Sequence, residues 1–139
     1  MKILTFGPKE RYDTYRPDFA DSLPVEEVYS PIDRSPLQAA AGNPDAQVIF
    51  TDTITDVGED IITLLPQLKL IQSEGVAFNR IDLEAARSRG IYVCNNKGFN
   101  SSSVAEHAIM LMLMALRHGV TGDRAVREGR QIQMKEAVM

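Results

Sequence analysis

Residues 68–95 read LKLIQSEGVAFNRIDLEAARSRGIYVCN, which has the form of a strand, a helix and a second strand. The runs 68–73 and 91–95 are short, rich in aliphatic residues and bounded by Gly, Pro or Asn, as strands usually are. Between them, Asp82 is placed to cap the first turn of a helix over 82–90, and Gly90 can take the left-handed conformation that ends it. The stretch therefore predicts a βαβ unit with parallel strands.

The same alternation extends toward the N-terminus. Three more strand-like runs lie at 2–6, 25–29 and 47–51, and helical signals fall at 33–42 and 58–66. Five strands that alternate with helices predict an α/β fold, a parallel sheet with helices on both faces. Ligands of such sheets bind just beyond the carboxyl ends of the strands, so the loops there are the candidate functional region.

The pattern changes after Cys94. The polar stretch NNKGFNSSS at 95–103 precedes an unbroken apolar run over 108–116. Ser103 and Glu106 have the spacing of a capping box, which predicts a long apolar helix that begins near Val104. Uniform hydrophobicity predicts burial of this helix on every side. The apolar run is too short for a bilayer, which needs about 20 apolar residues, so we expect no membrane segment.

Beyond this helix, Gly119 and Gly122 predict an interruption, and DRAVREGRQ at 123–131 predicts a separate polar helix. Its arginines alternate with acidic residues, as on a solvated helix face. The 139 residues carry a formal charge of −4 and no basic patch, so we expect no nucleic-acid partner.

The single cysteine, Cys94, excludes an internal disulfide and is typical of a reducing compartment. Its place in a strand-like run predicts a buried, small apolar side chain rather than a nucleophile. The opening MKILTFG is too short an apolar run for a signal peptide and lacks a cleavage pattern. These observations together predict a cytoplasmic protein.

Few residue patterns in the chain carry chemistry. The two histidines, His107 and His118, match no metal-ligand spacing, and the sequence contains neither GxGxxG nor GxxxxGK[ST]. A receiver-type phosphorelay domain would need clustered acids after the first strand, where Gly7 and Pro8 stand instead. The loop SEGVAFNRID at 73–82 remains, and two interpretations stay open: free backbone N–H groups that receive an anion, or a tight connection into the next helix.

The continuous stretch 68–118 resembles the D-isomer-specific 2-hydroxyacid dehydrogenases. It matches their sequence pattern in order and without a gap. The matching features are the glycine of GVAFNRID, the two alanines of LEAARSRG, the segment GIYV and the segment VAEHA. The resemblance implies a flavodoxin-like substrate domain over 1–100. It further implies an NAD- or NADP-dependent oxidoreductase that interconverts a 2-hydroxy acid and a 2-keto acid, and a crossing helix at the start of 101–139 that leads toward a Rossmann domain.

The resemblance also implies roles for individual residues. The backbone N–H groups of Val76 and Ala77 would bind the substrate carboxylate, the aromatic ring of Phe99 would line the pocket, and Val104 would lie near the nicotinamide. Ser73 stands in the substrate loop where many members have Arg, which indicates a different anion preference. Ala77 itself replaces a glycine of the family pattern, which narrows the space for the substrate.

The family's dinucleotide fingerprint and its catalytic Arg, Glu and His follow the crossing helix. We therefore expect an N-terminal piece of a dehydrogenase, with no catalytic residue, no metal site and no tight NAD binding of its own. The alternative is a non-catalytic binding or dimerisation module. For either, we expect the 104–118 helix to find cover in a second copy, as a homodimer.

Overall fold

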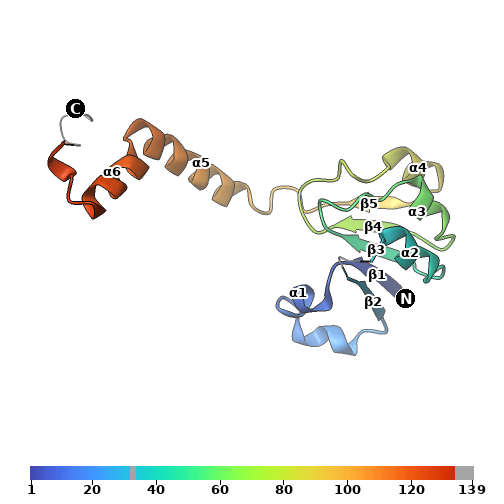
Figure 1. Cartoon of the computed structure of the whole chain (residues 1–139). Helices are drawn as coiled ribbons and strands as arrows, with labels where there is room; N and C mark the ends of the chain where they lie inside the picture. The colour runs from blue at the N-terminus through green and yellow to red at the C-terminus, as the bar shows by residue number, and fades with distance from the viewer. Residues whose placement is uncertain (32–33, 134–139) are drawn as a thin grey trace. The chain divides into compact units, whose positions relative to one another are not determined.

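The computed structural model describes residues 1–31 and 34–133, and the chain divides into two compact units, Met1–Lys97 and Gly98–Met139. The first unit is built on a five-stranded, entirely parallel sheet in the order β2-β1-β3-β4-β5 (Figure 1). The strands are β1 (Lys2–Phe6), β2 (Glu26–Ser30), β3 (Val48–Thr51), β4 (Leu70–Ser73) and β5 (Tyr92–Cys94). All five predicted strands are thus confirmed, and their order is the one found in flavodoxin-like sheets.

Three helices cover one face of this sheet: α2 (Pro36–Ala41), α3 (Glu59–Thr63) and α4 (Leu83–Ser88) (Figure 1). Their alanines and isoleucines pack against alternate strand residues to form the core. Both predicted caps of α4 are confirmed, because Asp82 Oδ1 accepts a hydrogen bond from the Ala85 N–H at 2.9 Å and Gly90 has a φ of 68°.

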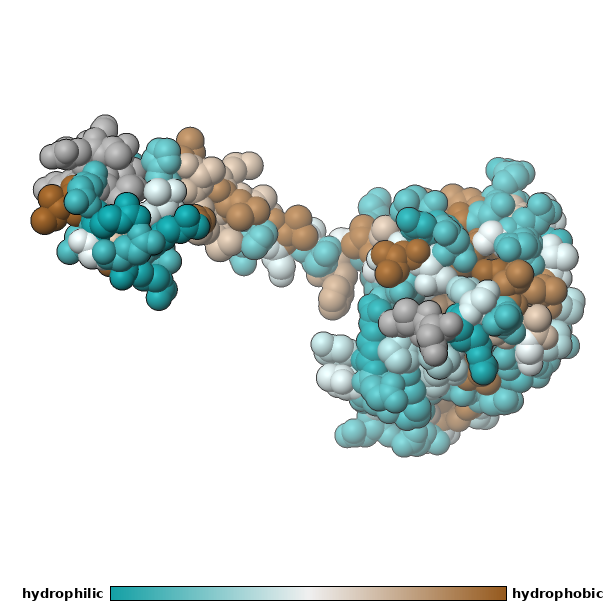
Figure 2. Space-filling model, viewed as in Figure 1, coloured by the Kyte–Doolittle hydropathy of each residue, from teal (hydrophilic) through white to brown (hydrophobic). Residues whose placement is uncertain are grey.

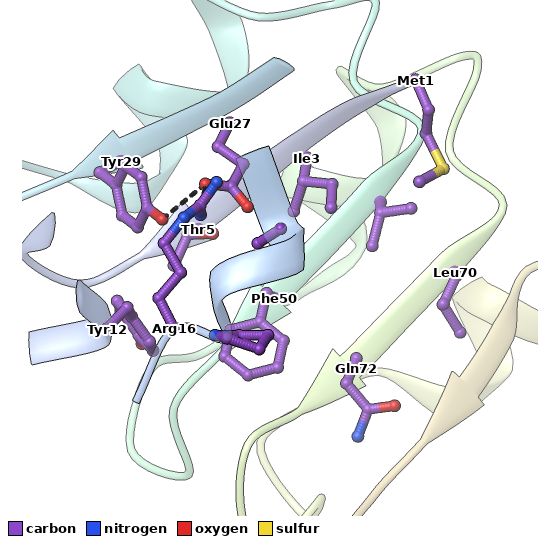
Figure 3. Close-up of a pocket in the computed structure, with 13 residues that line it drawn as sticks. Met1, Ile3, Thr5, Tyr12, Arg16, Glu27, Tyr29, Phe50, Leu70 and Gln72 are labelled. Atoms are coloured by element: carbon purple, nitrogen blue, oxygen red, sulfur yellow. Dashed lines mark hydrogen bonds and ion pairs between the residues drawn. The ribbon is translucent and has the colours of Figure 1, made fainter. Parts of the chain in front are cut away.

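The opposite face is covered over part of its area by α1 (Lys9–Asp13) and the 3₁₀ helix η1 (Asp18–Ser22). The sequence interpretation missed both, because neither buries a residue and so neither shows apolar periodicity. A cavity of about 420 Å³ lies under them, lined by strand residues that include Ile3, Phe50 and Leu70 (Figure 3).

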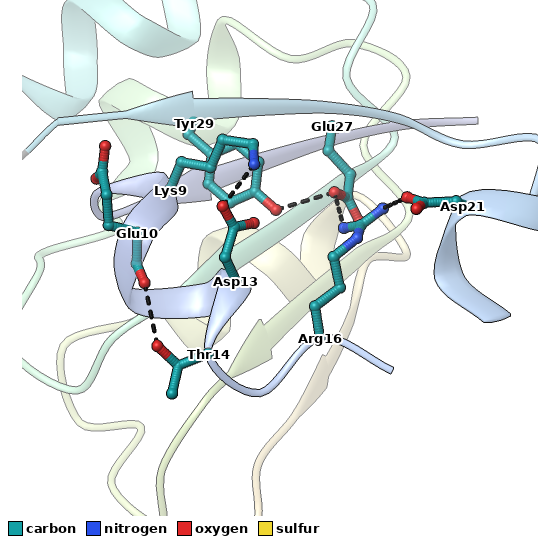
Figure 4. A network of polar contacts seen from close by, with 8 residues as sticks. All are labelled: Lys9, Glu10, Asp13, Thr14, Arg16, Asp21, Glu27 and Tyr29. Carbon is teal, nitrogen blue, oxygen red and sulfur yellow. Dashed lines mark hydrogen bonds and ion pairs between the residues drawn. The ribbon is translucent and has the colours of Figure 1, made fainter. Parts of the chain in front are cut away.

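A network of ion pairs holds α1 and η1 against β2 (Figure 4). The Arg16 guanidinium bridges Glu27 of β2 and Asp21 of η1, and the Tyr29 hydroxyl donates to Glu27 at 2.9 Å. The hydrogen bond to Glu27 is the main reason why the pKa of Arg16 lies above its usual value. These polar contacts supplement the small amount of apolar packing that the two short helices make.

The prediction that Cys94 is buried was wrong. Cys94 is exposed, as is Tyr92, because β5 is an edge strand and alternate side chains point to opposite faces. On that strand Val93 is the residue that packs against the core. A run of apolar residues marked the strand but could not show which face was covered.

The second unit contains α5 (Ser101–Leu116) and α6 (Gly119–Arg127). The predicted start of α5 near Val104 was wrong, since the helix begins one turn earlier at Ser101, after Asn100 and without a side-chain cap. The 3₁₀-like entry is fixed by the Ser101 hydroxyl, which donates to Gly98 O at 2.8 Å. The Ser103–Glu106 pair therefore lies inside the helix rather than at its boundary.

The predicted interruption exists, but glycine does not make it. His118, with φ of 51°, takes the left-handed position between the helices, and Gly119 and Gly122 both lie inside α6. A Cβ at Gly119 would meet Met114 at an ordinary van der Waals distance of 3.4 Å, so packing does not require glycine there. The polar helix predicted over 123–131 accordingly starts earlier and ends at Arg127.

No residue of α5 is buried in the described chain, and apolar side chains run along it (Figure 2). The expectation of burial on every side is therefore not met within this chain. Among residues 1–31 and 34–133, no helix combines the length and the apolar character that a bilayer crossing requires.

Candidate functional site

The loop that follows β4 has its carbonyl groups tied to neighbouring donors. The Ser73 hydroxyl donates to Ala77 O at 2.7 Å and the Asn95 side-chain amide donates to Val76 O at 2.6 Å. Asn96 donates twice, from its backbone N–H to Gly75 O at 2.9 Å and from its side chain to Glu74 O at 2.7 Å. Each carbonyl from residue 74 to residue 77 is therefore satisfied.

The N–H groups of the same loop divide into two kinds. Glu74 N–H donates to Thr51 O at 2.8 Å, and Gly75 N–H points to Ser73 Oγ at 3.4 Å. The next two N–H groups, of Val76 and Ala77, find no acceptor within the described part of the chain. Both residues are exposed, so two adjacent donors at the carboxyl end of a central strand are open to an acceptor from outside.

Gly75 is needed here for space. A Cβ on Gly75 would overlap the Cγ2 methyl of Thr53, in the loop after β3. The two loops also pair through Glu74 and Thr51, so the β3 and β4 connections form one packed edge. Gly75, the glycine of GVAFNRID, therefore permits close contact between the two loops.

The predicted site residues separate into two groups. Ser73, Val76 and Ala77 lie together in the β4 loop, whereas Phe99 and Val104 belong to the second unit, where their side chains are 89% and 56% exposed. Ser73 is itself buried, and its hydroxyl is engaged with Ala77 O. Ser73 therefore holds the conformation of the loop from its buried side and is not itself open to a ligand.

Asn95 and Asn96 were missed by the sequence interpretation, although they hold three of the loop carbonyls. A signal was present, because two amides stand directly after β5. The carboxyl ends of neighbouring parallel strands meet at one edge of the sheet, so the end of β5 must lie beside the loop after β4.

Tyr12 of α1 lies close to this edge. Its ring packs edge-on against Phe50, with ring centroids 5.5 Å apart, and its hydroxyl donates to Phe6 O at 3.2 Å. Burial raises the pKa of Tyr12 above its usual value, and the nearby charge of Glu74 raises the pKa further.

The raised pKa of Tyr12 predicts a loss of stability in alkali. A group whose pKa is higher in the folded chain than in the unfolded chain stabilises the folded chain at pH values below the unfolded pKa, which is about 10 for Tyr. That stability is lost as the pH rises above the unfolded pKa. In urea unfolding at about pH 8 and about pH 11, we expect Tyr12→Phe to show a shallower fall in unfolding free energy than the natural chain. Tyr15→Phe, at an exposed position, is the control. Equal slopes for the two variants would contradict the assignment.

No group of three or more His, Cys, Asp or Glu residues is arranged to hold a metal ion within the described ranges. His107 lies on α5 and His118 in the left-handed turn, so both belong to the second unit, whereas the loop residues belong to the first. The chemistry that this edge of the sheet supports is thus the binding of an anion by backbone N–H groups.

Comparisons with known proteins identify the family of the chain. The sequence profile of the family described as D-isomer specific 2-hydroxyacid dehydrogenase, catalytic domain, matches residues 13–139. The chain belongs to this family. A D-3-phosphoglycerate dehydrogenase of Archaeoglobus fulgidus is 42% identical over 132 residues, which cover 94% of this chain and 24% of that protein. The chain thus spans about a quarter of the length of this 2-hydroxyacid dehydrogenase.

Solved structures share the fold. An NAD-dependent formate dehydrogenase from Staphylococcus aureus, determined in complex with NAD, matches with a TM-score of 0.72 and 29% identity, over 93% of this chain and 41% of that one. A D-mandelate dehydrogenase of Rhodotorula graminis matches with a TM-score of 0.77 at 22% identity, over 99% of this chain and 44% of that one, and shows the shared fold.

Proposed function

We propose that residues 1–100 form the substrate domain of an NAD-dependent oxidoreductase that interconverts a 2-hydroxy acid and a 2-keto acid. The observation that carries the proposal is the pair of unpartnered N–H groups at Val76 and Ala77, in the stretch that matches the family. Their positive dipole ends suit the carboxylate that both forms of the substrate share.

The surrounding contacts favour an anion over a neutral ligand. Asn95 and Asn96 donate to the backbone carbonyls of residues 74–76, so these oxygens are already hydrogen-bonded. The Glu74 carboxylate is paired with Arg11. Ser73 is a positioning residue, since its bond to Ala77 O holds the turn. We assign Phe99 to the wall of the substrate pocket.

We assign the first turn of α5 to the cofactor side. Bound NAD would accept or supply the hydride, and Val104, apolar and 56% exposed, fits against the flat face of a nicotinamide ring. On this proposal α5 is the crossing helix between the substrate domain and the coenzyme domain, and 101–139 holds the start of the latter. A cytoplasmic location fits the exposed thiol of Cys94.

Amide NMR of the 139-residue chain tests the carboxylate site. On titration with pyruvate we expect saturable shifts centred on Val76 and Ala77, and none with pyruvamide, which has the same shape without the charge. Asn95→Ala should weaken binding about tenfold, because it releases Val76 O toward the ligand. Shifts of equal size with both compounds, or shifts that avoid the β4 loop, would argue against the proposal.

We further propose that α5 pairs with α5 of a second copy. Its support is the row of exposed apolar residues on a helix with no buried position, including Ile109, Leu113 and Leu116. In sedimentation experiments we expect a dimer, and at least about tenfold weaker association for the double variant Ile109→Glu and Leu113→Glu. Glu106→Gln is the control. A natural chain that stays monomeric at micromolar concentration with α5 helical would refute the pairing.

The same exposed helix supports a second candidate, a non-catalytic dimerisation module. The two experiments separate the candidates. Dimerisation without any pyruvate response at Val76 and Ala77 favours the module, whereas a pyruvate response favours the dehydrogenase.

A further inference from the structure

The cavity of about 420 Å³ lies on the face of the sheet that α1 and η1 partly cover. Two rows of side chains form its floor, because residues in register on parallel strands point to the same face. The aliphatic row is Ile3, Val48 and Leu70, and the next row is Tyr29, Thr5 and Phe50. Pro17 and Ala20, from the α1–η1 segment, line the cavity from the other side.

Three aromatic rings gather at this cavity. The ring centroid of Tyr12 lies 6.0 Å from that of Tyr29 and 5.5 Å from that of Phe50. Both tyrosine hydroxyls are engaged, since Tyr12 donates to Phe6 O at 3.2 Å and Tyr29 donates to Glu27 at 2.9 Å. The rings therefore offer apolar surface to a ligand.

The charged groups at the cavity are paired within the chain. The Arg16 guanidinium bridges Glu27 and Asp21. The amino group of Met1 lies on the exposed side, where it donates to Pro24 O at 3.2 Å. Among the described residues of the lining, Arg16 and Glu27 are the charged side chains, and they neutralise each other. The cavity therefore suits a neutral ligand better than an ion.

Thr5 differs from the other polar residues of the lining. It lies on the central strand β1 and is 4% exposed, and its hydroxyl has no hydrogen-bond partner in the described part of the chain. Among the described residues, the buried hydroxyls that are both unpartnered and closed to solvent are those of Ser30 and Thr51. The unpartnered Thr5 hydroxyl is thus still open, and it opens to the cavity that Thr5 lines (Figure 3). A hydroxyl in such a place gains from a hydrogen bond to a ligand.

We propose that this cavity binds a small neutral aromatic molecule with one N–H or O–H donor, of about the size of indole. Its ring packs on the aliphatic row and against the rings of Tyr12 and Phe50, and its donor bonds to Thr5 Oγ1. The volume lies near the lower end of the range of ligand pockets, about 300–1,000 Å³. The site is separate from the N–H pair of Val76 and Ala77 and does not depend on the proposed dehydrogenase function.

Amide NMR of the 139-residue chain with indole as the probe tests the proposal. We expect saturable shifts centred on Ile3, Thr5 and Phe50. Thr5→Val keeps the shape of the side chain without the hydroxyl, so it should raise the dissociation constant of indole at least about fivefold. N-methylindole lacks the N–H donor and should bind the natural chain and Thr5→Val equally. Thr63→Val, at an exposed position of α3 outside the cavity, is the control and should bind indole as the natural chain does.

A second variant fills the cavity. Val48→Phe places a larger side chain on the floor, so indole should no longer shift the amides of the cavity or raise the melting temperature. Thr5→Val guards against a variant that fails to fold. Without indole it should melt at or above the temperature of the natural chain, because it removes an unpartnered buried hydroxyl.

Several results would overturn the proposal. These are the absence of saturable shifts with indole, shifts confined to the apolar residues of α5, and equal dissociation constants for Thr5→Val and Thr63→Val. Indole binding that weakens as the chain concentration rises would place a second copy in the cavity, and it would also overturn the assignment to a small molecule. The amides of Val76 and Ala77 report on the carboxylate site in a pyruvate titration, so failure of one site is distinguishable from failure of the other.

Discussion

Ile49→Ala is expected to lower the free energy of unfolding by about 3 kcal/mol, within the 2–5 kcal/mol that such core truncations cost. Ile49 is fully buried at the middle of β3, in register with Leu4 of β1 and Ile71 of β4, which are also fully buried. Truncation removes buried apolar surface and leaves a cavity between the sheet and helices α2, α3 and α4. The helices cannot move enough to fill this cavity. Urea unfolding followed by circular dichroism measures the change.

The neighbouring residue of the same strand is the matched control. Val48 points to the opposite face, toward the cavity of about 420 Å³, and is only partly buried. We expect Val48→Ala to cost about 1 kcal/mol, because little packing surrounds it. Equal losses of unfolding free energy for the two variants would contradict the conclusion that one face of the sheet is fully covered and the other only partly.

Gly75→Ala is expected to cost about 1–3 kcal/mol, because its new methyl group overlaps Thr53 Cγ2, so that the Thr53 side chain or one of the loops after β3 and β4 must shift. The displaced loop carries the N–H groups of Val76 and Ala77, so pyruvate binding should weaken in the same variant. Urea unfolding and the pyruvate titration measure the two effects separately.

A second substitution should reverse this damage. Thr53→Ser removes the methyl group that Gly75→Ala would strike, and we expect the double variant to recover most of the lost stability and binding. Thr53→Ser alone should change either property little, since Thr53 is not part of the core. A double variant no better than Gly75→Ala would show that the glycine is required for another reason.

The sheet was predictable because five aliphatic runs, each bounded by turn residues, are separated by helical signals of the right length. Its less regular parts were not. Lys9–Asp13 and Asp18–Ser22 are held by ion pairs such as Arg16–Glu27, whose partners lie eleven residues apart and on different elements, beyond the reach of a helical or strand period. The exposure of Cys94 depends on β5 being an edge strand, and that follows from the strand order rather than from local sequence.

The candidate site was predictable in position but not in construction. A glycine among small residues after β4 located the loop, and the family resemblance drew attention to Val76 and Ala77. The hydrogen bonds that hold the loop were not predicted. Asn95 and Asn96 follow a different strand, and the Ser73 hydroxyl donates to the carbonyl of Ala77, four residues further along the chain.

The loop after β4 is held in shape by hydrogen bonds within the chain. Asn95, Asn96 and Ser73 fix it, and fixing a residue's backbone costs about 1–2 kcal/mol in conformational entropy, which folding has already met. If the loop binds a small acid as we propose, the acid need not order the chain, so the conformational entropy of the protein takes little from the binding free energy. On that proposal, a substrate with few contacts, such as a short 2-keto acid, is held by this loop where a flexible loop would release it.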